Sequence, residues 1–142
     1  MEQMSNLSPD TARWLADLVL VTHVGIVLFV VLGQLAILLG GWLGWTWVRN
    51  FMLRIVHLGL IVVIVLQAWL GRLCPLTIWE QGLRQRAGQA TYGDSFVEHW
   101  LSQLIFFDAP WWAFVVAYTL FGVVVLATWI WLPPRRRLPR SA

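Results

Sequence analysis

Three long apolar runs constrain the fold of this 142-residue chain more than any other feature. They cover residues 18–39, 51–70 and 112–132. An α-helix needs about 20 residues to cross about 30 Å of hydrocarbon, and each run has that length. Backbone amides find no water in lipid, so such runs must be helical; strands of a membrane barrel would be shorter and would alternate in polarity. The sequence therefore predicts an all-α, helical integral membrane protein with three transmembrane helices.

Composition supports this class and predicts one membrane domain over residues 1–142, with the lipid bilayer as its partner. Hydrophobic residues make up 59% of the chain and charged residues only 12%, whereas a soluble domain is about 25% charged. The eleven tryptophans gather near the ends of the runs, where amphipathic rings favour the membrane interface. The arginine-rich tail is too short and too proline-rich for a nucleic-acid module, so no nucleic acid is expected as a partner.

The arginines predict the orientation in the membrane. With three spans, six arginines fall on one side and four on the other. The six are Arg49, Arg54, Arg135, Arg136, Arg137 and Arg140, and the four are Arg13, Arg72, Arg84 and Arg86. Because the cytoplasmic side carries the excess of basic residues, we expect a cytoplasmic C-terminus and an N-terminus outside.

The connection between the second and third spans predicts two short interfacial helices, over residues 78–86 and 95–107. Each follows a capping box, in which a hydroxyl and a carboxylate three residues later satisfy free backbone amides. The two boxes pair Thr77 with Glu80, and Ser95 with Glu98. The second helix has an apolar and a polar side, so we expect it at the membrane interface. A four-helix bundle that includes this helix stays open.

Ionisable groups inside a membrane are costly, which draws attention to His23 in the first run and His57 in the second. A rise of about 1.5 Å per residue places them about 12 Å apart in depth, so one metal or haem iron does not easily join them. Gln67 lies near the depth of His23, and Gln34 near that of His57. The sequence thus predicts two interhelical hydrogen-bonded pairs, His23 with Gln67 and Gln34 with His57.

An alternative site lies at the outer face, where several reactive side chains converge if the short helices fold over the bundle. Its candidate residues are His23, Cys74, Glu80, Arg84, Tyr92 and His99. Metal binding, proton transfer and capture of an anionic head group all stay open for such a set, with His23, His57 and His99 as the candidate metal ligands. Structural roles are also open, because Glu80 and Arg84 have the spacing of an ordinary helical ion pair.

The order of these residues follows a recognisable pattern. A histidine in each of the first two runs precedes Cys74-Pro75-Leu76-Thr77, Glu80, Leu83-Arg84, Ala87-Gly88, Tyr92, Ser95-Phe96 and His99. This pattern resembles a widespread family of small bacterial inner-membrane proteins of unknown function. The resemblance implies a bacterial inner-membrane location and a motif that includes His23, His57, Cys74, Glu80, Arg84, Tyr92 and His99. It implies no activity.

Three functions stay open at this point. The favoured hypothesis is a structural or accessory membrane component that contacts another membrane protein or a second copy of itself, because the chain is small and has no nucleotide loop or hydrolase motif. The second is a metal- or haem-binding redox or sensing protein that uses His23, His57 or His99. The third is a lipid-interacting membrane enzyme, in which Arg84 and Arg86 hold an anionic head group.

Overall fold

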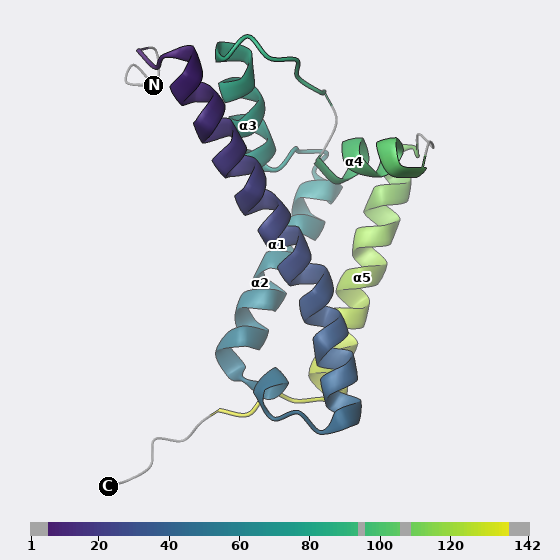
Figure 1. The fold of residues 1–142 in the computed structure, drawn as a ribbon. Helices are drawn as coiled ribbons and strands as arrows, with labels where there is room; N and C mark the ends of the chain where they lie inside the picture. Colours follow the sequence, from purple (N-terminus) through teal and green to yellow (C-terminus); the bar gives the residue numbers. More distant parts are fainter. Residues whose placement is uncertain (1–5, 94–95, 106–108, 137–142) are drawn as a thin grey trace, which may run out of the picture.

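The computed structural model describes residues 6–93, 96–105 and 109–136, and in this part of the chain the regular elements are helices (Figure 1). They are α1 (Pro9–Leu43), a short 3-10 helix η2 (Trp47–Arg49), α2 (Phe51–Trp69), α3 (Pro75–Arg86), α4 (Phe96–Ile105) and α5 (Trp111–Trp131). The predicted all-α class is confirmed. Helices α1, α2 and α5 are long and apolar enough to cross a membrane.

Helices α2 and α5 begin and end within one residue of the predicted spans, but α1 is much longer than the run at 18–39. It starts at Pro9, where proline suits the first helical position and the Ser8 hydroxyl accepts the Thr11 amide at 3.3 Å. It ends at Leu43, and the next residue, Gly44, has a φ of 73° that allows a left-handed cap. Its 35 residues span about 52 Å, which exceeds the thickness of the hydrocarbon layer.

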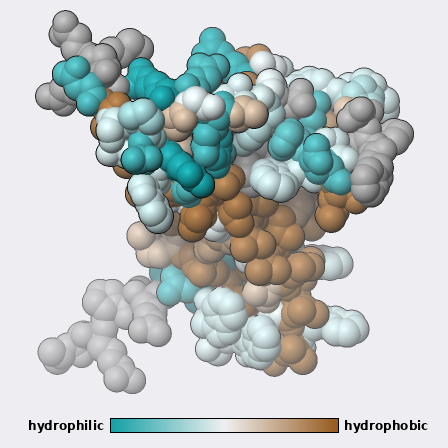
Figure 2. Space-filling model, turned by 45° about the horizontal axis from the view of Figure 1, so that its top comes forward, coloured by the Kyte–Doolittle hydropathy of each residue, from teal (hydrophilic) through white to brown (hydrophobic). Residues whose placement is uncertain are grey.

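The extra length of α1 packs against α3, which lies beside its N-terminal half (Figure 1). Ala12 and Ala16 are fully buried here and meet Leu83 of α3. Two alanines one turn apart present little bulk, so the helices approach closely. We call this pair, residues 9–22 of α1 with α3, the head. Figure 2 shows hydrophilic residues gathered at this end of the molecule and hydrophobic residues below it.

Helix α3 begins earlier than the sequence predicted. Its first residue is Pro75, with Cys74 at the cap position and no side-chain capping bond. The expected capping box of Thr77 with Glu80 is therefore wrong, because Thr77 lies inside the helix, fully buried, and Glu80 binds other residues. The predicted end at Arg86 is confirmed.

Helix α4 lies across the N-terminal end of α5 rather than along the spans, so it is not a fourth parallel member of the bundle (Figure 1). Ser95 and residue 107 lie outside the described residues, and with them the second capping box and the expected end of this helix. Trp100, Leu101 and Leu104 are exposed, whereas His99 and Ser102 are half-buried. An outward apolar side is what an interfacial helix presents to lipid.

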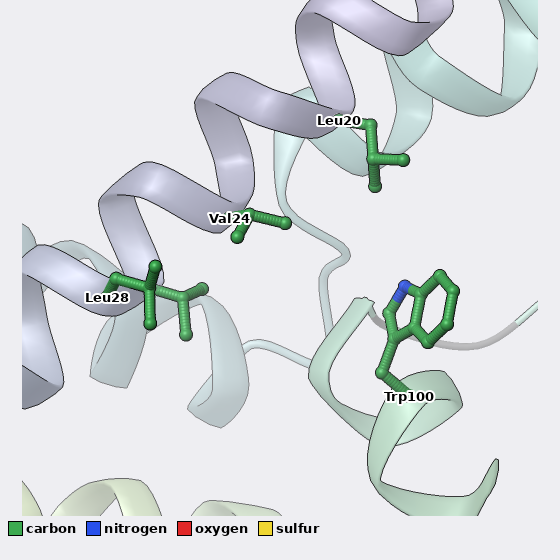
Figure 3. Close-up of a pocket in the computed structure, with 5 residues that line it drawn as sticks. Leu20, Val24, Leu28 and Trp100 are labelled. Atoms are coloured by element: carbon green, nitrogen blue, oxygen red, sulfur yellow. The ribbon is translucent and has the colours of Figure 1, made fainter. Parts of the chain in front are cut away.

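A shallow apolar groove separates α4 from α1. Its volume is about 390 Å³, and Figure 3 shows Trp100 of α4 facing Leu20 and Val24 of α1 across it. Val27 and Leu28 complete the lining, which is wholly apolar. Lipid chains suit such a surface.

Below the head, the spans share one core. Val30 of α1, Ile61 of α2 and Val125 of α5 are buried together. Of the three long helices, α2 and α5 pack most extensively against each other, and at Gly122 an added Cβ would lie 3.3 Å from a Val65 methyl. The absence of a side chain there lets the two helices approach.

Candidate functional site

A buried carboxylate, Glu80, forms the centre of a polar cluster in the head. Its side chain is 1% exposed, and both oxygens accept hydrogen bonds. Oε1 accepts from Arg84 Nε at 2.8 Å, and Oε2 accepts from the Tyr92 hydroxyl at 2.8 Å. A carboxylate so deeply buried is tolerated only when it is paired and hydrogen-bonded, and both conditions are met here.

Arg84 joins three parts of the chain through its guanidinium. Besides the expected ion pair with Glu80, Nη1 donates to Gln89 at 3.0 Å and Nη2 to Asp17 of α1 at 3.3 Å. Burial acts to lower the pKa of Arg84, but the bonds and charges of Glu80 and Asp17 outweigh it, so the pKa lies above its usual value. Asp17, Glu80, Arg84, Gln89 and Tyr92 together form what we call the head cluster.

Sequence reasoning missed two members of this cluster. Asp17 had a usable signal, because it is the last carboxylate before a stretch of more than sixty residues that ends at Glu80 and contains no other acid. Gln89 had no such signal, since it follows α3 in an irregular segment.

Tyr92 connects the head cluster to α4. Burial raises the pKa of its phenol, and the hydrogen bond to Glu80 and the charge of Glu80 raise it further. The ring stacks on the imidazole of His99, with centroids 4.1 Å apart and planes 12° from parallel. The His99 ring in turn meets Trp100 edge to face. These contacts hold α4 against the segment that follows α3.

The remaining outer candidates lie near this cluster to different degrees. His23 of α1 is buried and lies close enough to Glu80 for their charges to interact. Cys74 is half-buried at the start of α3, six residues before Glu80 and so about 9 Å away along the axis. The structure thus brings His23, Glu80, Arg84, Tyr92 and His99 to one end of the molecule, with Cys74 at its margin. The pairing of His23 with Gln67 stays a prediction.

A second polar cluster lies inside the three-span bundle. His57 of α2 is 1% exposed, and its Nε2 lies 2.8 Å from the Val30 carbonyl of α1. A carbonyl oxygen only accepts, so Nε2 must carry the proton. An added Cβ at Gly33 would lie 3.2 Å from the ring, which explains the glycine at this contact.

The predicted bond between Gln34 and His57 is absent, because the imidazole instead binds the carbonyl one turn earlier. Gln34 is 2% exposed, and neither atom of its amide has a hydrogen-bond partner within the described residues. Its burial was correctly anticipated, but its partner was not.

Arg54, the fourth residue of α2, completes this second cluster and was missed as a buried group. Its side chain is 1% exposed. Nη2 donates to the Thr128 hydroxyl at 3.4 Å, and the guanidinium lies 5.5 Å from the centre of the Trp129 ring. Among described residues, Nε and Nη1 have no acceptor. Sequence reasoning used Arg54 only as one of the positive charges that predict membrane orientation, although its place inside the apolar run 51–70 was a signal for burial.

The candidate metal ligands that the structure describes lie apart from one another. In the described ranges, no group of three or more histidine, cysteine, aspartate or glutamate side chains is placed to hold a metal ion. His57 binds the carbonyl of Val30, seven residues beyond His23, so the two histidines differ in level by about 10 Å along α1. Axial ligands of one haem iron must approach to about 4 Å.

The fold and these two clusters define a small all-helical protein whose described residues include three helices long and apolar enough to span a bilayer. Within that class, the chain belongs to the family described as protein of unknown function DUF2784, which matches residues 13–134. No curated protein and no solved structure matches the chain. The Cys-Pro-Leu-Thr motif proposed from the sequence stays a prediction.

Proposed function

We propose that this protein is a structural or accessory component of the bacterial cytoplasmic membrane. One observation carries the proposal: both oxygens of the buried Glu80 are used by Arg84 and Tyr92. A catalytic or ligand-binding carboxylate needs an oxygen that a substrate can reach. This one instead fastens α3 to the segment after it, and through Arg84 to α1, so the motif residues serve to build the head.

The orientation follows from the charges. Arg49, Arg135 and Arg136 lie together at the end away from the head, where Arg49 binds the Pro133 carbonyl at 3.0 Å and the Arg49 carbonyl accepts the Arg135 amide at 2.7 Å. The positive-inside rule puts this end in the cytoplasm. The head then faces outward.

A contact with another membrane protein, or with a second copy, suits the side of α1 that its neighbours leave uncovered. Leu28, Leu32 and Leu35 are each about half exposed, at 50%, 54% and 49%. Spacings of four and three residues place them in one row along the helix. Such a row meets either lipid tails or the helix of a partner.

The test is to purify the protein in mild detergent, record its visible absorption and metal content, and compare thermal unfolding of Glu80→Gln with that of Asp10→Asn. Asp10 is an exposed acid of the same head, so it controls for charge. We expect a colourless, metal-free protein, a lowered melting temperature for Glu80→Gln, and little change for Asp10→Asn. A Soret band or stoichiometric metal that His23→Ala or His99→Ala removes from folded protein would favour redox or sensing instead.

A further inference from the structure

The bundle interior contains a charged group, the Arg54 guanidinium, whose hydrogen-bonding capacity the described residues do not fill. Arg54 is 1% exposed and gives one long bond to Thr128. Its Nε and Nη1 have no acceptor in the described part of the chain. Arginine stays charged in proteins, and a buried charge without a counter-ion is strongly unfavourable. An anion bound to this guanidinium would therefore stabilise the fold.

Within the described residues, no carboxylate side chain is found beside Arg54. No Asp or Glu occurs between Asp17 and Glu80, or after Asp108. Of the acids that the structure describes, Asp17 and Glu80 lie in the head, at the far end of α1 and α2 from Arg54. The neighbours of Arg54 at its own end include Arg49, whose charge acts on it unfavourably.

A second donor points to the same place. His57 lies opposite Val30, and α1 and α2 run in opposite directions. Three residues back along α2 lead to Arg54, and four residues onward along α1 lead to Gln34, both about 5 Å toward the same end. Gln34 is 2% exposed, and its amide nitrogen also has no partner within the described residues.

We infer that the interior between α1, α2 and α5 binds a phosphate group through Arg54 and the amide of Gln34. A guanidinium matches phosphate oxygens in geometry as well as charge. Arg54 is in the first turn of α2, so in a bilayer-spanning helix it would lie about 5 Å inside the edge of the hydrocarbon layer, within reach of lipid phosphates. A phosphodiester head group is thus one source of this anion, and free phosphate is the other.

Two aromatic rings cover the site and define its entrance. The Trp129 ring lies over the guanidinium, and Phe51 packs edge-on against Trp129. Outside them, the Arg136 guanidinium lies 4.8 Å from the centre of the Phe51 ring. A phosphate attracted by Arg136 reaches Arg54 when the Trp129 ring moves aside. This inference does not depend on the role of the head cluster.

The test uses native mass spectrometry of the full chain in mild detergent, with phosphatidylglycerol or diacylglycerol of the same acyl chains. The variants are Arg54→Gln and, as a matched control, Arg72→Gln, which alters an exposed arginine outside the second cluster. We expect wild type and Arg72→Gln to retain phosphatidylglycerol but not diacylglycerol, and Arg54→Gln to bind it about tenfold more weakly, the effect of losing a charged hydrogen bond.

A separate arm identifies the source of the phosphate. In this arm, inorganic phosphate is added to lipid-free wild type and the melting temperature is measured. A rise as large as that caused by phosphatidylglycerol would assign the site to free phosphate. No such rise would assign the site to lipid. Gln34→Ala, which removes no charge, must also weaken retention, and it decides the matter if Arg54→Gln does not fold. Equal retention in wild type and Gln34→Ala, equal losses in Arg54→Gln and Arg72→Gln, or equal binding of diacylglycerol would overturn the inference.

Discussion

Replacing Arg84 with methionine gives the sharpest test of how the head is held together. The substitution keeps an unbranched apolar stem but removes the guanidinium that neutralises Glu80. Breaking a buried ion pair from one side costs about 3–5 kcal/mol. The Arg84 side chain is 15% exposed and Tyr92 still donates to Glu80, so we expect a loss of about 2–3 kcal/mol in the free energy of unfolding.

Asp17→Asn provides the comparison within the same network. The Asp17 side chain is 47% exposed and its oxygen lies 3.3 Å from Arg84, so solvent screens this pair and its loss should cost less than about 1 kcal/mol. Reversible unfolding in mixed micelles, followed by circular dichroism, would measure both variants. Arg84→Met should therefore be the more destabilised by at least a factor of two.

The double variant Glu80→Gln/Arg84→Met distinguishes two effects of Arg84→Met: the loss of the bond to Glu80 and the burial of an unpaired Glu80 carboxylate. Removing both partners leaves no unpaired carboxylate, so the double variant should be more stable than Arg84→Met alone. The reasoning fails if the two single costs simply add, or if Arg84→Met costs no more than Asp17→Asn.

Three further predictions concern other parts of the molecule. Because the pKa of Tyr92 is raised in the folded protein, the unfolded chain releases this proton first as the pH rises. The contribution of Tyr92 to stability is therefore complete below pH 10 and falls above it. Tyr92→Phe, compared with wild type in thermal unfolding below and above pH 10, should lack that fall. Gly40→Ala should lower the free energy of unfolding by about 1–3 kcal/mol, because its Cβ would lie 2.7 Å from a methyl of Val48 in η2. Gly25→Ala is the control: its Cβ would have no atom within 4 Å, so thermal unfolding should show no loss of stability. A membrane-impermeant thiol reagent should label Cys74 in intact cells; an Arg136→Cys variant lacking Cys74 should react only after permeabilisation, and the reverse pattern would invert the topology.

The ends of α2 and α5 could be predicted to within a residue, because the hydrocarbon layer favours apolar residues and the interface favours tryptophan. Both preferences are visible in the sequence. The length of α1 could not, because residues 9–17 mix polarities and become helical through the alanine contacts with α3. That packing depends on residues about seventy positions apart. A hydropathy pattern carries no information on such a contact.

The candidate site likewise includes contacts that could be predicted from the sequence and contacts that could not. The pairing of Glu80 with Arg84 follows from helical spacing and was predictable. The capping box at Thr77 was wrong because α3 begins at Pro75, which places Thr77 inside the helix, and Glu80 binds Arg84 and Tyr92. The depth of Gln34 was predictable from the rise of a helix. Whether His57 binds the Gln34 side chain or the Val30 carbonyl, one turn earlier, depends on how α1 and α2 are rotated about their axes.

The continuity of α1 has a mechanical consequence. The same helix packs against α3 in the head and against α2 at Val30, and its one proline, Pro9, is at the first position, where it causes no kink. The head and the bundle therefore share a rigid axis without a hinge. When bilayer thickness changes the tilt of this helix, the head must rotate by the same angle, so a change in the membrane is converted into a movement of the surface that a partner would meet.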